Sequence, residues 1–290
     1  MQKNRIIYIV VVLVIALVII GLAKTRNSKI DKNEVQASNT TDTTTAVTEK
    51  PQVKPEPALK ASPESAAISA AAKKDRYVFV TFYRKDDAAS KKMQAAMKPV
   101  QAKFSRRASF VSVDVDSPIQ QELVLQYGAD RSPIPLTLVI APNGAVTAGY
   151  PSEITNTDFS SAFVSNGMAS VIKVLQDRKL AAVCIQGPRT KNNKKSLATA
   201  EELKAAPELG GAVEIVKINP SDPAEFRFIK ECKIDARSTD AQLLVLAPPG
   251  KLVGKFASTD TMDTIMTTLK SALGGGGCGG GSCGAGGCGP

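Results

Sequence analysis

The residues of this chain most able to do chemistry are its thiols, and three of the five cysteines lie in an unusual tail. Residues 274–290 consist mostly of glycine, with Cys278, Cys283 and Cys288 at every fifth position. A glycine-rich segment buries too little apolar surface to form a core, so these tail cysteines are not there for packing. Their thiolates suit a soft ion such as Cu(I), or they form disulfides with each other or with a second copy of the chain.

Three roles therefore stay open for the tail. The chain has no histidine, and one tail cannot supply the four Cys or His ligands of a closed zinc site. Copper binding, a mobile thiol arm that could link a homodimer, and a low-complexity terminus without a function all fit the spacing. We expect no other cofactor. The remaining thiols, Cys184 and Cys232, lie in an apolar strand pattern and near the end of a helical pattern, where cysteine packs as a small hydrophobe.

A second set of polar residues lies between positions 82 and 93, which read Phe-Tyr-Arg-Lys-Asp-Asp-Ala-Ala-Ser-Lys-Lys-Met. Aspartate is among the best residues to begin a helix, because its carboxylate accepts hydrogen bonds from free amides and favours the positive end of the helix dipole. We therefore expect Asp87 to cap a helix. Neither Asp87 nor Ser90 can attack a disulfide, since that reaction needs a thiolate.

This segment resembles the active-site segment of thioredoxins, in which a strand ending in Phe-Trp precedes Cys-x-x-Cys at the start of a helix. Asp87 and Ser90 stand at the two cysteine positions, and Thr81 stands where the family has a buried acid. Pro135 falls at the family's cis-proline, directly before an apolar strand at 136–140. The resemblance covers residues 74–178 and implies an α/β fold with a central mixed sheet flanked by helices.

Two further signals fall inside this region. Asn143-Gly144 predicts a tight hairpin turn with positive φ at both residues, followed by a last strand to position 150. A helical pattern from 158 to about 178 is expected to close the first domain.

The same plan then repeats, because residues 245–256 align with residues 139–150, and 216–219 with 113–116. Residues 179–273 are therefore predicted to form a second, degenerate thioredoxin-like domain. Its Cys-x-x-Cys position falls in the loop at 189–195, which has no cysteine, and Ala241 stands at its cis-proline position.

The first 73 residues are predicted to tether the two domains to a membrane. Residues 6–23 carry no charge, and as a helix they would extend roughly 27 Å, close to the thickness of a bilayer core. We expect residues 1–24 to form an uncleaved single-pass anchor, with a signal peptide as the alternative. Residues 25–73, rich in Thr, Ser, Ala, Pro and Lys, are predicted to be a disordered linker.

Charge gives no clear orientation for this anchor and no nucleic-acid surface. Positive residues flank both ends of the apolar segment, so the positive-inside rule does not favour a translocated C-terminus. The resemblance to anchored envelope proteins implies that the globular part is extracytoplasmic, in the periplasm.

The net charge is +10, but the basic residues are spread along the chain and lack interleaved aromatics. We expect no nucleic-acid partner, and attraction to an anionic membrane surface is the simpler use of the charge.

These features predict a membrane-anchored, redox-inactive thioredoxin-like binding or scaffold protein of the cell envelope, without thioredoxin-type enzymatic activity. The groove beside Pro135 is expected to hold protein partners. The competing hypothesis is a thiol-disulfide oxidoreductase, or a copper-handling protein, that uses the tail cysteines.

Overall fold

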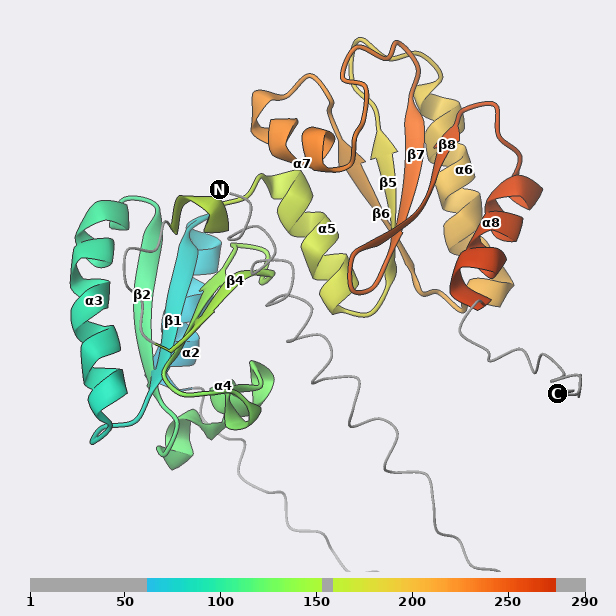
Figure 1. Cartoon of the computed structure of the whole chain (residues 1–290). Coiled ribbons are helices and arrows are strands. Elements are labelled where there is room, and N and C mark those ends of the chain that lie inside the picture. The colour runs from blue at the N-terminus through green and yellow to red at the C-terminus, as the bar shows by residue number, and fades with distance from the viewer. Residues whose placement is uncertain (1–61, 153–158, 275–290) are drawn as a thin grey trace, which may run out of the picture.

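The computed structural model describes residues 62–152 and 159–274, which form two α/β units (Figure 1). The first unit contains α2 (Pro63–Lys73), β1 (Tyr77–Tyr83), α3 (Ala88–Phe104), β2 (Ala108–Asp114), η1 (Pro118–Gln120), α4 (Gln121–Gln126), η2 (Ala129–Arg131), β3 (Leu136–Ile140), β4 (Val146–Pro151) and η3 (Phe159–Ala162). The second contains α5 (Asn166–Gln176), β5 (Leu180–Ile185), α6 (Asn193–Ala205), η4 (Pro207–Leu209), β6 (Val213–Ile218), η5 (Pro223–Glu225), α7 (Phe226–Glu231), β7 (Gln242–Ala247), β8 (Lys251–Ala257) and α8 (Met262–Gly274).

Each unit is built on a four-stranded mixed sheet, and the two sheets have the same strand order. The orders are β2-β1-β3-β4 and β6-β5-β7-β8. In each sheet the first pair is parallel and the other two pairs are antiparallel. The central strands β1 and β5 read as nearly continuous apolar runs, because both of their faces are covered. The two sheets fit the predicted tandem of thioredoxin-like units.

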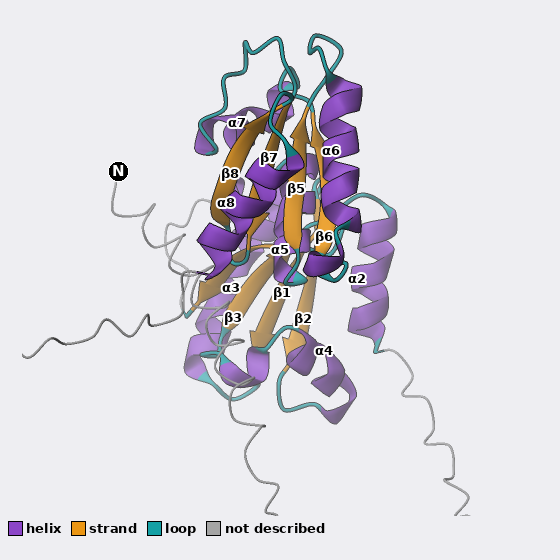
Figure 2. Ribbon diagram, turned by 90° about the vertical axis from the view of Figure 1, so that its right-hand side faces the viewer, coloured by secondary structure: helices purple, strands orange, loops and turns teal. Residues whose placement is uncertain are grey.

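Helices cover both faces of each sheet, as Figure 2 shows for the second unit. In the first unit, Met93, Met97 and Phe104 of α3 pack with η3 on one face, and Leu123 and Val124 of α4 pack with α2 on the other. In the second unit, α6 and α8 cover one face, and α5 and α7 cover the other.

The predicted linker is too long at its C-terminal end, because residues 63–73 form α2. Ser62 caps this helix through a hydrogen bond from the Ser65 amide to its hydroxyl, and Pro63 occupies the first helical position, where no amide is needed. Ala71 is buried against the first sheet. These residues are small and have little apolar surface, but they form a helix here because one face of it packs against the neighbouring sheet.

The helical pattern expected from 158 to 178 is shorter in the structure, and it serves both units. Ser165 caps α5, so the regular helix begins at Asn166. Ala169 of this helix packs in the core of the first unit, whereas Val171 packs in the core of the second. The buried carboxylate of Glu225 accepts hydrogen bonds from the Ser165 hydroxyl and the Gly167 amide, which fixes the start of α5.

The turn at Asn143-Gly144 differs from the predicted primed type. Gly144 has φ +83°, but Asn143 does not have positive φ. The Gly144 amide bonds to the Ala141 carbonyl, so the turn spans residues 141–144 with Pro142 at its second position. Proline fixes φ near −65°, which favours an ordinary turn followed by a left-handed glycine over a primed turn.

Candidate functional site

The two residues at the former cysteine positions form a closed hydrogen-bond network at the start of α3. The Asp87 carboxylate accepts hydrogen bonds from the Ser90 amide and the Ser90 hydroxyl, both at 2.7 Å. These two bonds lower the pKa of the Asp87 carboxyl. The Ser90 side chain is fully buried, and its oxygen accepts a bond of 3.1 Å from the Arg84 amide. The predicted cap is confirmed. The serine hydroxyl is buried and already hydrogen-bonded, so it is not accessible to a bound partner.

The buried acid of the resemblance is replaced by a pair of hydroxyls. Thr81 on β1 and Thr137 on β3 lie opposite each other in the antiparallel register. Their side-chain oxygens are 3.0 Å apart, and both residues are buried. The hydroxyls satisfy each other, so this part of the site carries no ionisable group that could exchange a proton with a neighbour.

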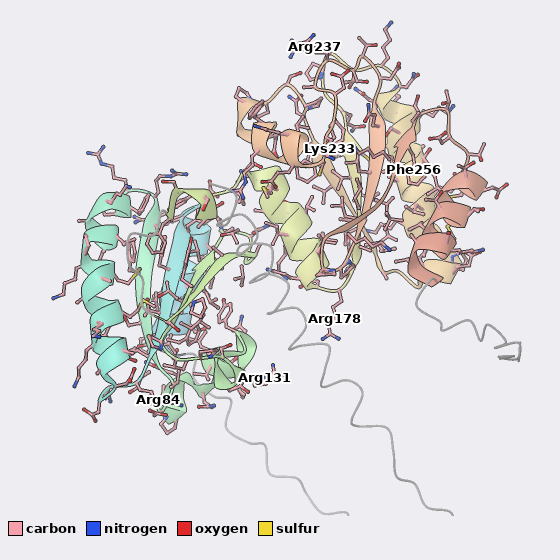
Figure 3. The ribbon with its side chains drawn as sticks, viewed as in Figure 1. Arg84, Arg131, Arg178, Lys233, Arg237 and Phe256 are labelled. Atoms are coloured by element: carbon pink, nitrogen blue, oxygen red, sulfur yellow. The ribbon has the colours of Figure 1, made fainter. Side chains whose placement is uncertain are left out.

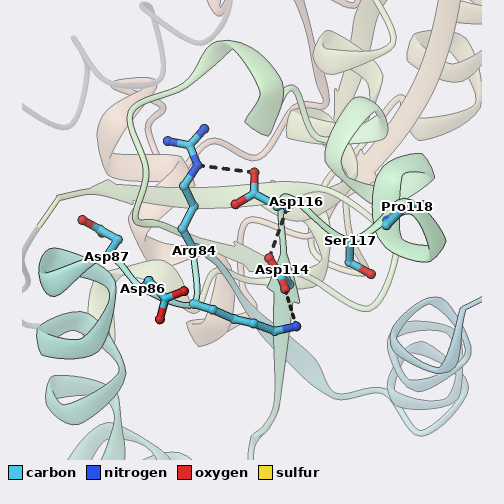
Figure 4. Close-up of a pocket in the computed structure, with 8 residues that line it drawn as sticks. Arg84, Asp86, Asp87, Asp114, Asp116, Ser117 and Pro118 are labelled. Carbon is cyan, nitrogen blue, oxygen red and sulfur yellow. Dashed lines mark hydrogen bonds and ion pairs between the residues drawn. The ribbon is translucent and has the colours of Figure 1, made fainter.

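An open hollow of about 620 Å³ is lined by residues 84–87 and by residues 114 and 116–118 (Figure 4). Two ion pairs lie within it: Lys85 Nζ is 3.2 Å from Asp114 Oδ2, and Arg84 Nε is 3.6 Å from Asp116 Oδ1. Hydrogen bonding to Asp114 raises the pKa of Lys85. Figure 4 shows the Asp87 carboxylate pointing away from Asp114 and Asp116. Across the described ranges, no group of three or more His, Cys, Asp or Glu side chains is arranged to hold a metal.

The backbone at Pro135 lies at the same end of the first sheet as the Asp87 loop, because Leu136 pairs with Phe82 at the end of β1. The Ile134–Pro135 peptide bond is cis, as predicted. The Pro135 carbonyl accepts a bond from the Ser152 amide. The amide and carbonyl of Ile134 have no hydrogen-bond partner within the described part of the chain. Among the described residues, Ile134 therefore has an unpaired donor and an unpaired acceptor beside the vestigial site.

The equivalent place in the second unit is closed by the chain itself. The Lys191 amide donates to the Thr239 carbonyl at 2.7 Å, and the Ala241 amide donates to the Lys191 carbonyl at 3.0 Å. The loop that carries Lys191 is held in turn by Thr190, whose hydroxyl bonds to Gly187 and Asn193. A backbone segment of this chain is thus bonded to both sides of Asp240, the residue that matches Ile134.

Neither of the two thiols within the described ranges lies at a former cysteine position. Cys184 is fully buried in the core beneath α6 and α8, and Cys232 packs against the opposite face of the same sheet. Burial raises the pKa of each thiol to about 11. Both are free cysteines that pack as predicted, and neither is a thiolate near neutral pH.

Several predicted features fall outside the described residues. These are the apolar segment at 6–23, the linker before position 62 and the tail cysteines. Within the described ranges, no helix is both long and apolar enough to cross a membrane.

Both units have the strand order and the helices on both sheet faces that the resemblance to thioredoxins implies. No family model and no curated protein matches the chain. Among solved structures, the germline-specific thioredoxin Deadhead of Drosophila melanogaster is 21% identical with a TM-score of 0.27, covering 32% of this chain and 83% of its own. The N-terminal domain of alkylhydroperoxide reductase AhpF from Enterococcus faecalis is 14% identical with a TM-score of 0.24, covering 71% of this chain and 99% of its own. Human ERp44 is 13% identical with a TM-score of 0.29, covering 71% and 55%.

The sequence interpretation missed the closure of the second site by Lys191. One signal was available: the loop between β5 and α6 has seven residues (186–192), whereas the loop between β1 and α3 has four (84–87). The longer loop is what reaches the segment at 239–241. The hydrogen bond from the Arg84 amide to Ser90 was also missed, and nothing in the residue types predicts it.

Proposed function

We propose that this chain is a membrane-anchored, redox-inactive binding protein whose first unit holds an extended segment of a partner protein. The observation that carries the proposal is that the Ile134 amide and carbonyl, beside the closed Asp87–Ser90 network, have no partner among residues 62–152 and 159–274. Ile134 lies just before β3, and unpaired backbone donors and acceptors are the groups to which an extended peptide can add by hydrogen bonds. Such a partner would be bound without any reaction.

The absence of a reactive thiol at the site supports binding over catalysis. Disulfide exchange needs a thiolate close to the bound partner. The former cysteine positions carry a carboxylate and a buried hydroxyl, and Cys184 and Cys232 are both protonated near neutral pH. A reaction at this groove would therefore need the tail cysteines, which keeps the oxidoreductase and copper-handling hypotheses as the alternatives.

The comparison between the two units supports a single binding groove for each chain. In the second unit Asp240 stands at the matching position, where its amide donates to the Ser238 hydroxyl and its carbonyl accepts from it. The neighbouring Thr239 carbonyl and Ala241 amide are bonded to Lys191, so an added peptide would have to displace these contacts. Breaking two internal hydrogen bonds to form two new ones gives little net gain. We therefore assign partner binding to the first unit and a supporting role to the second.

The test is peptide binding by the full chain, with amide hydrogen exchange as the site-resolved measurement. A random library of extended peptides is screened, and the best binders are added to uniformly labelled protein. Exchange of the Ile134 amide should slow at least tenfold on binding, while the Ala241 amide stays unchanged. Binding that protects the 189–195 loop, or leaves the Ile134 amide unprotected, would place the partner elsewhere and overturn the proposal.

A matched pair of variants separates the groove from a nonspecific surface. Ile134→Pro removes the free donor and should weaken peptide binding by about tenfold, the usual order for one good hydrogen bond. Asp240→Pro is the corresponding change in the second unit and should leave binding unaltered. Equal losses in both variants, with folding unchanged by circular dichroism, would contradict the assignment to the first unit.

A further inference from the structure

The helix α3 carries a one-sided positive charge that neither the fold nor the proposed groove requires. Between Asp87 and Asp114 the sequence contains six basic residues and no acidic residue. The exposed members are Lys91, Lys92, Lys98, Lys103, Arg106 and Arg107. We call the first five of these the α3 basic face; Arg107 is left out because its guanidinium stacks 4.2 Å from the Phe163 ring.

The lysines of this face lie on one side of the helix. The buried positions of α3 are Ser90, Met93, Met97 and Phe104. At about 100° per residue, the lysines project from the opposite side. The other exposed residues of the helix are small or uncharged, chiefly Ala95, Pro99 and Ala102. Figure 1 shows α3 on the outer side of the first unit, away from the second, and Figure 3 shows side chains tipped with nitrogen projecting outward from it.

Contacts among the described residues do not account for the charges of Lys91 and Lys98. The helix dipole favours cations at the C-terminal end, which suits Lys103 and Arg106, but it disfavours a cation in the second turn, where Lys91 lies. Neither Lys91 nor Lys98 forms an ion pair with any carboxylate among the described residues. The corresponding helix of the second unit, α6, balances its lysines with Glu201 and Glu202.

We propose that the α3 basic face binds the surface of a membrane that contains anionic phospholipids. The face is a convex strip about 25 Å long, a shape that fits a charged plane better than a groove. Lysine is a hydrated point charge, suited to diffuse attraction to such a plane. The face has no exposed aromatic ring on which a base could stack, which disfavours single-stranded nucleic acid. This inference does not depend on the peptide groove.

The expected size follows from the number of charges. Each lysine near an anionic surface increases partitioning by roughly fivefold, so three lysines together contribute on the order of a hundredfold. The attraction falls within a Debye length of about 8 Å at physiological salt and should weaken strongly at 0.5 M NaCl, where screening is about twice as steep.

Lysine footprinting of the full chain tests the proposal without separating the domains. The protein is reconstituted in nanodiscs of neutral phosphatidylcholine, or of the same lipid with about one third phosphatidylglycerol, and brief acetylation is followed by mass spectrometry. Acetylation of Lys91, Lys98 and Lys103 should slow at least threefold in the anionic discs, and added salt should remove the difference. Three exposed lysines of the second unit, Lys194, Lys195 and Lys270, are the internal control and should react equally in both discs.

A second measurement uses the absence of tryptophan from the chain. Ala95→Trp places a fluorescent donor in the centre of the face, and Ala198→Trp places one on the exposed side of α6. Energy transfer to dansyl-labelled lipid should rise in anionic discs for the first variant only. Adding Lys91→Gln, Lys98→Gln and Lys103→Gln should abolish that rise, whereas Lys194→Gln, Lys195→Gln and Lys270→Gln should not.

Equal footprints in neutral and anionic discs, or transfer that is unaffected by the α3 substitutions, would overturn the proposal. Protection of the α3 lysines by added RNA or duplex DNA, but not by anionic lipid, would overturn it in favour of a nucleic-acid surface.

Discussion

The role of Ser90 can be tested sharply, because the second unit provides a matched serine with the opposite environment. Ser90 is fully buried, donates to Asp87 and accepts from the Arg84 amide. Ser196 near the start of α6 is also buried, at 2% exposure, but its hydroxyl has no hydrogen-bond partner. Substitution by alanine removes a hydroxyl in both cases, but only the hydroxyl of Ser90 is hydrogen-bonded.

The expected magnitudes differ in sign. A bond to a charged acceptor contributes about 1.5–3 kcal/mol and a neutral bond about 0.5–1.5 kcal/mol, but water can reach the exposed Arg84 backbone and replace part of the loss. We therefore expect Ser90→Ala to lower the free energy of unfolding by about 1–3 kcal/mol. Ser196→Ala removes a buried hydroxyl that forms no hydrogen bond, so it should leave the free energy of unfolding unchanged or raise it by up to about 1 kcal/mol.

The assay can read the units separately. Four of the five tyrosines lie in the first unit, the fifth is Tyr8, and the chain has no tryptophan. Tyrosine fluorescence during urea or thermal unfolding therefore reports the first unit, and circular dichroism reports both. A loss of 1 kcal/mol should lower the melting temperature of a unit of this size by about 4–8 °C. If Ser90→Ala is no more costly than Ser196→Ala, the hydrogen-bond network does not stabilise the site and the reasoning fails.

Three further predictions concern other parts of the chain. Hydrogen bonds from Lys179 and Lys204 lower the pKa of Glu214 to about 2 from its ordinary 4.5, so its contribution to stability is present above pH 4.5 and is lost as the pH falls towards 2. Glu214→Gln should make the urea midpoint less dependent on pH across that range. A midpoint that depends on pH as strongly as in the unmodified chain would refute the pairing. Thr81→Val and Thr137→Val should each lower the free energy of unfolding by about 1–3 kcal/mol, because each leaves the other hydroxyl unpaired. The double variant should lose clearly less than the sum of the two, and a double-mutant cycle measures this coupling. Replacing the three tail cysteines with serine should leave the unfolding of both units intact while abolishing Cu(I) binding or disulfide-linked dimers, and a variant that keeps both properties would reduce the tail to low-complexity sequence.

Local sequence was sufficient for the features that depend on neighbouring residues. The cap at Asp87 follows from one side chain and the amides of the next turn, and it forms as predicted. The strand at 136–140 has the predicted bounds, because an apolar run between turn residues needs no distant contact to be recognised. The lack of thiols at the former cysteine positions is likewise a property of residue type alone.

Tertiary structure decided the features in which distant backbone groups meet. The helix at 63–73 has little intrinsic apolar surface, and it forms because the first sheet receives Ala71. Helix α5 contributes to both cores because each sheet packs against a different face of it. The periodicity of apolar residues alone does not predict which sheet packs on which face.

The two units differ in the backbone contacts beside this position. No described residue bonds to the Ile134 amide or carbonyl, whereas the segment at 239–241 bonds to Lys191, which lies on the longer loop of the second unit. Residue types decide one difference, because Pro135 has no amide whereas Ala241 at the matching position donates one to Lys191, but every non-proline residue offers the same backbone donor and acceptor. Which of those groups remain available to a partner is therefore set by long-range packing and not by the sequence pattern.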